Sequence, residues 1–432
     1  MKPRAGAVFA ASAAISLAAL SPSSAMADEV IGYYPGWKSA EYPVTAVNVG
    51  ADKLTMALYA FIDVCWDGKH GNPEPSINDE APCQDAAGEP ASANGALVFG
   101  NAVSDGANLR ALVALKKQHP KFKVVVSVGG WNWSNRLSDV ADSAAARANF
   151  VASSVKLMRR FGLDGIDIDW EYPTEVGVPC VAGRVCARPQ DKPNYIKLVR
   201  ALRAAFDAAG KKDGKHYSVT IASGANANFV NDGAAGSGWI KELAQSLDWI
   251  NIMTYDYHAP WEKTTGHLAA LGGDPKDPVA SKGLYAQASV QRYLDAGIGA
   301  DKLVMGVPFY GYGWKGCAPG PAGDGQYQLC EGGATGGAGG GNAYGFSHLL
   351  KQGILTPAFE GGNGYQRYWN ASAKAPYLYN AKEKIWITYE DQESLKGKAR
   401  FIKSKRLRGA MFWELSADGE HQLIETLWSA MR

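Results

Sequence analysis

The sequence predicts an α/β protein folded as a (β/α)8 TIM barrel, with a small α+β insertion between its seventh and eighth strands. Two observations support this prediction. Short β-rich runs alternate with amphipathic helical stretches, which is typical of a parallel sheet with crossover helices. Eight such units within 432 residues suit a barrel that carries insertions. A doubly wound open sheet is the alternative, but it would carry a Gly-rich nucleotide loop after an early strand, and no such loop occurs there.

The N-terminal residues have the layout of a secretory signal peptide. Lys2 and Arg4 precede an apolar, Ala-rich run over residues 5–20, and the small residues SSAMA then offer a cleavage site. The apolar run is shorter than the roughly 20 residues that a membrane span needs. No later stretch is long and apolar enough to span a membrane. We therefore expect residues 1–27 to be removed, leaving residues 28–432 as a secreted, extracellular barrel.

The charge balance argues against two classes of partner. Removing Lys2 and Arg4 from the 44 basic residues leaves 42, against 42 acidic residues. A neutral chain has no basic excess that would attract nucleic acid or an anionic membrane, so we expect neither partner. The 13 Trp and 20 Tyr residues offer faces that stack on sugar rings, although a large core also uses aromatic residues.

The predicted strands are runs of Val, Ile, Tyr and Phe bounded by Gly, Pro or Asp. In order, they cover residues 30–36, 53–64, 121–130, 165–171, 217–223, 249–255, 302–311 and 408–415. The helix candidates between them show apolar residues at intervals of three and four. They cover residues 108–119, 146–161, 194–210, 285–297 and 394–405.

The gap between the seventh and eighth strands is unusually long. Residues from about 315 to about 388 contain a cysteine pair, a Gly-rich tract at 331–345 and strand-like runs at 375–380 and 384–389. A connection of this length with structure of its own indicates a small inserted subdomain. The Gly-rich tract does not follow a strand and lacks a GK[ST] ending, so we interpret it as a flexible surface loop rather than a phosphate site.

The six cysteines fall into three pairs that are close in sequence: Cys65 with Cys83, Cys180 with Cys186, and Cys317 with Cys330. In an exported chain, an even number of cysteines favours disulfides, although six allow 15 connectivities. A zinc site is the alternative, but no pair has CxxC spacing and no His lies at ligand spacing. We expect three disulfides, with local pairing as the hypothesis.

The stretch DGIDIDWEYP, residues 164–173, places four carboxylates in an apolar strand. Side chains alternate along a strand, so two sets of three share opposite faces: Asp167, Asp169 and Glu171 on one, and Ile166, Ile168 and Trp170 on the other. The apolar set should face the covering helices, which turns the three carboxylates into the barrel. Asp164 is out of phase with them.

Three buried carboxylates are too costly to serve structure alone, because like charges repel and burial disfavours ionisation. Such a cluster shares protons and can keep one acid protonated at neutral pH. Glu171 lies nearest the C-terminal end of the strand, where barrel active sites open. A metal site would need a His or a second carboxylate cluster, so we expect no metal and no cofactor. A half-exposed strand would account for one Asp but not for three acids.

The stretch LDGIDIDWEYP resembles the DxxDxDxE signature of glycoside hydrolase family 18, the chitinases. The resemblance continues in order along nearly the whole chain after the signal peptide. Its further segments are GYYPGW (32–37), YAFID (59–63), SVGGW (127–131), MTYDYH (253–258), GVPFYG (306–311) and MFWEL (411–415). The insertion before the eighth strand is similar to that of the deep-cleft chitinases. One position departs from the pattern, because Tyr312 stands where many relatives carry Arg.

The resemblance implies a retaining chitinase that cleaves β-1,4 bonds between N-acetylglucosamine units with help from the substrate. Glu171 would protonate the glycosidic oxygen, and the substrate's own 2-acetamido oxygen would attack the anomeric carbon, giving an oxazolinium ion. Asp169 would orient the acetamido N–H and stabilise the positive charge. Asp167 would share a proton with Asp169. Water would then open the ring with Glu171 acting as base.

The resemblance also implies residues that hold the sugar. Tyr255 and Asp256 would hold the acetamido oxygen and the sugar, Met253 would line the pocket, and Trp413 would form its floor. Further pocket candidates are Tyr33, Phe61, Trp131 and Tyr310, whereas Ser127, Gly129 and Gly130 would shape the barrel floor. The expected partners are chitin and chitooligosaccharides, bound by a monomer. The alternatives are an endo-β-N-acetylglucosaminidase that acts on N-glycans and a non-catalytic chitin-binding lectin, a class that typically lacks the acidic Glu.

Overall fold

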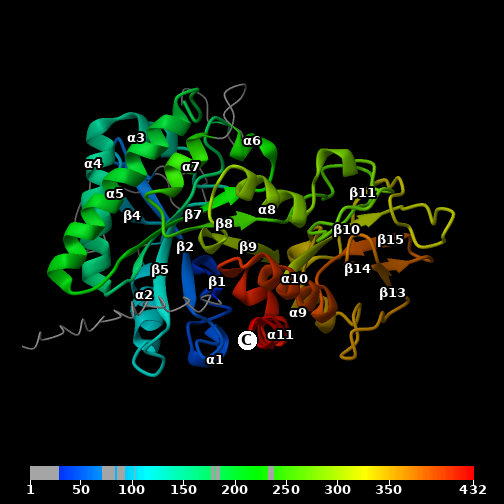
Figure 1. The fold of residues 1–432 in the computed structure, drawn as a ribbon. Helices are drawn as coiled ribbons and strands as arrows, with labels where there is room; N and C mark the ends of the chain where they lie inside the picture. The colour runs from blue at the N-terminus through cyan, green and yellow to red at the C-terminus, as the bar shows by residue number, and fades with distance from the viewer. Residues whose placement is uncertain are drawn as a thin grey trace, which may run out of the picture.

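Eight parallel strands close into a barrel in the computed structural model (Figure 1). They are β1 (Glu29–Pro35), β2 (Met56–Trp66), β5 (Lys123–Gly129), β6 (Gly165–Asp169), β7 (Ser218–Gly224), β8 (Trp249–Met253), β9 (Leu303–Pro308) and β16 (Gly409–Trp413). Each pairs with the next in this order, and β1 pairs with both β2 and β16, which closes the ring. The predicted barrel is confirmed.

The structure describes residues 29–70, 83–84, 93–101, 103–175, 177, 180, 185–231 and 238–432. The predicted signal peptide lies outside the described residues. Within them, no helix is both long and apolar enough to cross a membrane.

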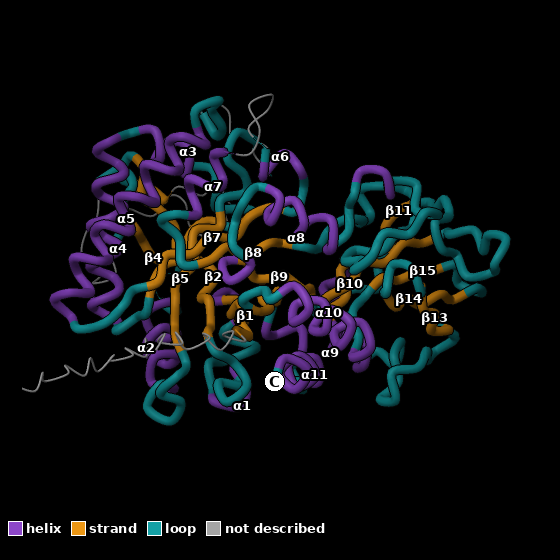
Figure 2. The backbone as a smooth tube through the Cα atoms, viewed as in Figure 1, coloured by secondary structure: helices purple, strands orange, loops and turns teal. Residues whose placement is uncertain are grey.

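Helices surround the barrel on its outer side (Figure 2). They are α1 (Ala46–Val49), α2 (Asp105–Leu115), α3 (Leu137–Asp142), α4 (Ala144–Phe161), α5 (Asp191–Asp213), α6 (Ala227–Val230), α7 (Gly238–Ala244), α8 (Ala286–Asp295), α10 (Gln392–Lys405) and α11 (Gln422–Met431). Local signals set several ends. The Ser143 side chain caps α4 by accepting the N–H of Ala146, and Gly162 ends that helix in the left-handed conformation. Asp391 and Ser394 form a capping box at the start of α10.

The barrel has two apolar layers. Ile166, Ile168 and Trp170 belong to the outer core between strands and helices, as their phase predicts. The opposite faces of the strands fill the barrel interior, where a separate cluster includes Tyr33 and Met253. Register places Asp167 of β6 between Ser127 of β5 and Thr220 of β7. The acidic face of β6 is therefore directed into the barrel.

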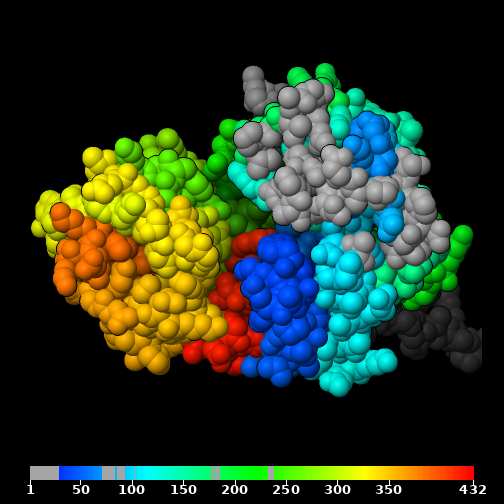
Figure 3. Space-filling view, turned by 180° about the vertical axis from the view of Figure 1, so that it is seen from behind, coloured from blue at the N-terminus to red at the C-terminus, as the bar shows by residue number. Residues whose placement is uncertain are grey.

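A second, antiparallel sheet lies between β9 and β16 in the chain. Its strands are β10 (Tyr310–Lys315), β11 (Gly332–Gly333), β12 (Ala343–Gly345), β13 (Gln366–Asn370), β14 (Ala375–Asn380) and β15 (Ile385–Thr388), with α9 (Phe346–Lys351) between β12 and β13. Trp314 and Trp386 pack with the Cys317–Cys330 bridge in its own small core. In Figure 3 this subdomain, in yellow and orange, stands beside the blue N-terminal part of the barrel, with red C-terminal residues between them.

The cysteines form the three predicted local pairs: Cys65–Cys83, Cys180–Cys186 and Cys317–Cys330. Asp164 lies at the opposite end of β6 from Asp169. Its carboxylate accepts hydrogen bonds from Lys116 Nζ at 2.6 Å and from the N–H of Val124 at 2.9 Å. This residue ties the start of the strand to its surroundings, away from the other three carboxylates.

Candidate active site

A cleft with a volume of about 1970 Å³ opens at the carboxyl ends of the barrel strands and is bordered by the inserted subdomain. Pockets for single small molecules typically measure about 300–1000 Å³, so this cleft has room for an extended ligand. Nine predicted site residues line it: Phe61, Trp131, Asp169, Glu171, Met253, Tyr255, Asp256, Tyr310 and Trp413. The other two, Tyr33 and Asp167, are buried beneath the lining.

Asp167 is a fully buried carboxylate that accepts four hydrogen bonds. Oδ2 accepts from the hydroxyls of Tyr33 at 2.9 Å and Ser127 at 2.7 Å. Oδ1 accepts from Thr220 Oγ1 at 2.6 Å and Asn251 Nδ2 at 3.2 Å. Burial raises the pKa of Asp167, and the four donors oppose that rise by stabilising the ionised form.

Asp169 has the contrasting environment. Its Oδ1 atom is buried and has no hydrogen-bond partner among the described residues. Burial raises the pKa of Asp169 well above its usual range, and the negative charges of Glu171 and Asp167 raise it further. The pKa of Asp169 is therefore raised more strongly than that of Asp167, whose four donors favour its ionised form.

Glu171 lies two residues beyond the end of β6, where its side chain reaches the cleft. Burial raises the pKa of Glu171 to about 7, hydrogen bonding from Tyr172 lowers it, and the negative charge of Asp256 raises it. A carboxylic acid with this pKa keeps its proton in part of the population at neutral pH, which is what a general acid requires.

Asp256 also lines the cleft, and the phenol groups of two tyrosines contact its carboxylate. The Tyr310 hydroxyl donates to its Oδ1 atom at 2.6 Å, and Tyr312 also hydrogen-bonds to the carboxylate. Burial raises the pKa of Asp256 to about 6, against these hydrogen bonds. Tyr312 occupies the position where an Arg was expected from the resemblance. A neutral hydroxyl therefore contacts this acid where a cation would have favoured its ionised form.

Aromatic rings form one wall of the cleft. The Trp413 ring lies 5.7 Å from that of Phe61 and 6.0 Å from that of Trp37, measured between ring centroids. Trp37 also stacks on Phe61 at 6.1 Å with an interplanar angle of 15°. Trp37 is 56% exposed and Trp131 is 50% exposed, so both present open faces in the cleft. Such faces stack on the apolar faces of ring-shaped ligands.

The structure changes the roles of two predicted residues. Tyr33 is only 1% exposed, so it contacts Asp167 rather than the open cleft. Ser127, expected only to shape the floor, donates directly to Asp167. Thr220 and Asn251 were not anticipated. Their signal was present in the sequence, since each is a polar residue on the inward face of a predicted strand.

Two further residues were missed near the carboxyl ends of the strands. Trp37 ends the quoted segment GYYPGW, where its position beyond the first strand was the available signal. Ser134 accepts the backbone N–H of Glu171 at 2.9 Å, a contact with no counterpart in the strand pattern. Among the described residues, no group of three or more His, Cys, Asp or Glu side chains is arranged to hold a metal ion.

Comparisons with known proteins identify related chains. The model of the family described as "Glycosyl hydrolases family 18" matches residues 29–418. Chitinase A1 of Niallia circulans is 42% identical over 433 residues, which cover 95% of this chain and 60% of that protein. Chitinase B of Serratia marcescens is 33% identical over 362 residues, covering 72% of this chain and 67% of that protein.

Among solved structures, chitinase ChiA74 from Bacillus thuringiensis matches with a TM-score of 0.83 and 38% identity. The match covers 94% of this chain and 70% of that chain. The matches to the Niallia and Bacillus proteins therefore cover almost the whole of the present chain, but the chain spans only 60% of the length of the Niallia protein.

Proposed function

The chain belongs to family 18 of the glycosyl hydrolases, and on that premise we propose that it is a chitinase. Its reaction would be the hydrolysis of β-1,4 bonds between N-acetylglucosamine units of chitin and chitooligosaccharides. One observation carries the proposal: Glu171, with a pKa of about 7, and Asp169, whose Oδ1 atom has no hydrogen-bond donor among the described residues, lie together in a large cleft lined by aromatic rings. The chitinases among its relatives support the substrate class.

In the proposed reaction, Glu171 donates its proton to the glycosidic oxygen while the bond to the anomeric carbon breaks. The substrate's 2-acetamido oxygen forms the new bond to that carbon and gives a cyclic oxazolinium ion, so no protein nucleophile is needed. Asp169 accepts the acetamido N–H and stabilises the positive charge. Water then attacks the anomeric carbon with Glu171 as base, and the β configuration is retained.

Other residues of the cleft hold the sugar in this proposal. Tyr255 donates to the acetamido oxygen, Asp256 contacts the sugar near the cleavage point, and Trp413 stacks under it. Their support is that all three line the same cleft as Glu171. Asp167 stays buried and controls the protonation of Asp169 through the proton that the two aspartates share.

A turnover assay tests this function. The protein should release the fluorophore from a fluorogenic chitooligosaccharide, and Glu171→Gln should remove that activity while binding persists. NMR of freshly cleaved oligomers should show the β anomer first, and analogues without the 2-acetamido group should not be cleaved. An initial α product would contradict retention. Binding without turnover would indicate a lectin, and release of glycans from a glycoprotein would indicate an endo-β-N-acetylglucosaminidase.

We also propose that the protein is secreted after cleavage behind residue 27 and acts as a monomer. Three disulfides support an oxidising destination, because such bridges persist outside the reducing cytosol. Mass spectrometry of protein recovered from the culture medium should show an N-terminus at Asp28. Light scattering should give the mass of a single chain, whereas an intact N-terminus or a dimer mass would contradict these proposals.

A further inference from the structure

The segment Glu171–Thr174 begins two residues beyond the end of β6 and carries the proposed general acid, yet it belongs to no strand or helix. Thr174 has a φ of 74°, in the left-handed region that β-branched residues rarely adopt. Such a conformation persists only when surrounding contacts hold it. Two buried side chains from other segments supply these contacts, and each accepts a backbone N–H of this segment.

Ser134 makes the first contact. It lies between β5 and α3, is 5% exposed, and its hydroxyl oxygen accepts the N–H of Glu171 at 2.9 Å. The same hydroxyl group lies 2.9 Å from the carbonyl oxygen of Gly130 and 3.1 Å from that of Asp169, to either of which it donates its proton. One side chain therefore joins the backbone at Asp169 and Glu171 to the loop that follows the neighbouring strand β5.

Asp191, the first residue of α5, makes the second contact and is fully buried. Its Oδ2 atom accepts the N–H of Thr174 at 3.0 Å and the N–H of Arg188 at 2.8 Å. Its Oδ1 atom accepts the hydroxyl of Ser138 at 2.7 Å. The carboxylate therefore links the end of the segment that carries Glu171 to α3 and to the start of α5.

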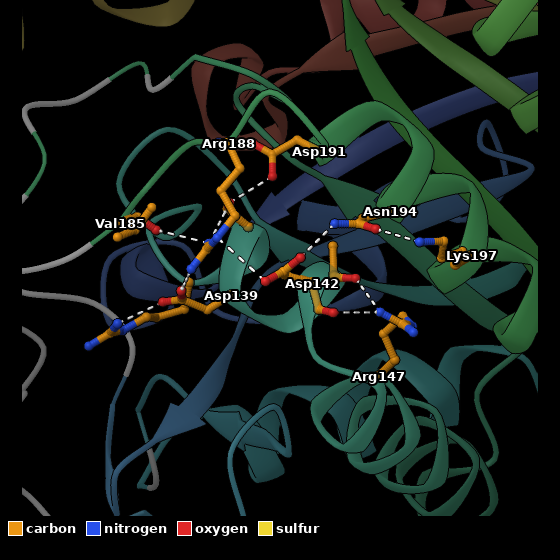
Figure 4. A network of polar contacts seen from close by, with 11 residues as sticks. Asp139, Asp142, Arg147, Val185, Arg188, Asp191, Asn194 and Lys197 are labelled. Atoms are coloured by element: carbon orange, nitrogen blue, oxygen red, sulfur yellow. Dashed lines mark hydrogen bonds and ion pairs between the residues drawn. The ribbon is translucent and has the colours of Figure 1, made fainter.

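Arg188, whose backbone N–H donates to Asp191, belongs to a wider polar network that Figure 4 shows. The Arg188 guanidinium donates to Asp139 Oδ1 at 2.6 Å and to Ser138 Oγ at 2.8 Å, so it anchors this region to α3. Farther out, Asp142 accepts from Asn194 Nδ2 at 2.9 Å. Asp142 belongs to the same network through its contacts with Asn194 and Arg188.

We propose that Ser134 and Asp191 are positioning residues for the reaction: together they form a backbone clamp that aims Glu171 at the bond to be cleaved. This inference rests on the proposed function. The clamp acts on the main chain at residues 171 and 174, so the Glu171 side chain is left free to transfer its proton. Displacements near 1 Å at a reacting group can cost about a hundredfold in rate, so a small backbone shift here would be measurable.

The test compares Ser134→Ala and Asp191→Asn with two matched controls on a chitooligosaccharide. Ser154→Ala removes another buried hydroxyl, which donates to the Phe150 carbonyl oxygen within α4. Asp142→Asn changes another carboxylate of the network in Figure 4. We expect kcat to fall about tenfold or more in the two clamp variants, with KM within about twofold of its original value. The controls should keep kcat.

Two additional measurements distinguish a role in positioning Glu171 from a general loss of stability. The basic limb of kcat/KM should move to lower pH in the clamp variants, as Glu171 loses its buried position, and Ser134→Thr should restore kcat by restoring a hydroxyl. Clamp variants with unchanged kcat, equal losses in the controls, or no rescue by Thr at an unchanged Tm would overturn the proposal.

A measurement of Tm without substrate tests the clamp even if the proposed function is wrong. If the unmodified protein cleaves no chitin, Glu171→Gln should still raise Tm at pH 8, and this gain should be smaller in the Ser134→Ala background. A smaller gain would support the clamp although the chitinase proposal had failed. A gain of the same size in both backgrounds would overturn the clamp.

Discussion

The hydroxyl of Tyr33 on β1 donates to Oδ2 of Asp167 on β6 at 2.9 Å. These strands are three places apart in the barrel order, so the contact crosses the interior. It is one of four hydrogen bonds that Asp167 accepts, whereas no described residue donates to the buried Oδ1 atom of Asp169. This difference in hydrogen bonding accompanies a pKa of Asp169 that is raised more strongly than that of Asp167.

Tyr33→Phe should lower kcat about tenfold or more with little change in KM. Losing a hydrogen bond to a charged group costs about 1.5–3 kcal/mol, and the loss would raise the pKa of Asp167, so the proton that it shares with Asp169 would no longer be distributed as the proposed reaction requires. Steady-state kinetics on a chitooligosaccharide would measure the effect. Tyr34→Phe is the matched control, since the Tyr34 hydroxyl donates to the carbonyl oxygen of Tyr42. Equal losses in both variants would refute the explanation.

Glu171→Gln should reduce kcat by roughly a hundred- to ten-thousandfold, because a neutral amide cannot transfer the proton. The far-UV circular dichroism spectrum should stay unchanged, since Gln has nearly the same shape. Glu175→Gln, four residues further along the chain, is the control for a general effect of losing one charge. Turnover near that of the original protein would contradict the assigned role.

The stability of the same variant should depend on pH in a defined direction. Burial raises the pKa of Glu171 from its ordinary value of 4.5 to about 7. The stability that this group contributes is therefore present below about pH 4.5 and is lost as pH rises through about 7. Gln does not titrate, so the Tm of Glu171→Gln should exceed that of the original protein at pH 8 but not at pH 4. Calorimetry that showed the same difference at both pH values would contradict this.

Activity should also fall as pH rises through about 7, because kcat/KM reports the protonation of the acid in the free protein and the pKa of Glu171 is about 7. A full pH profile on a soluble oligomer would measure this basic limb. Activity that stayed constant up to pH 9 would mean that another group supplies the proton.

Trp37→Ala should raise KM for long oligomers about 5- to 30-fold and leave short ones nearly unaffected, because one exposed stacking face is worth about 1–2 kcal/mol. The Trp37 ring continues the wall formed by Phe61 and Trp413, beyond the residues that carry out the chemistry. Trp369→Ala is a suitable control, since that ring pairs with the Arg367 guanidinium in the inserted subdomain. An equal effect on long and short oligomers would exclude an extended wall.

Much of the fold could be predicted from the sequence alone. The alternation of strand and helix patterns predicted the barrel, and the two-residue period of DGIDIDWEYP predicted which face of β6 is acidic. The local cysteine pairs predicted the disulfides. These features could be predicted because they depend on the periodicity and spacing of residues that are close together in the sequence.

Tertiary structure decided which hydrogen-bond donors and charges surround the carboxylates. Asp167 receives its donors from β1, β5, β7 and β8, and no local pattern specifies that Tyr33, Ser127, Thr220 and Asn251 meet at one carboxylate. The same holds for Ser134 and Asp191, which reach the backbone beside Glu171 from separate segments. Strand phase sets a side chain's direction, whereas its pKa depends on burial and on charges and donors that only the closed barrel brings within a few ångströms.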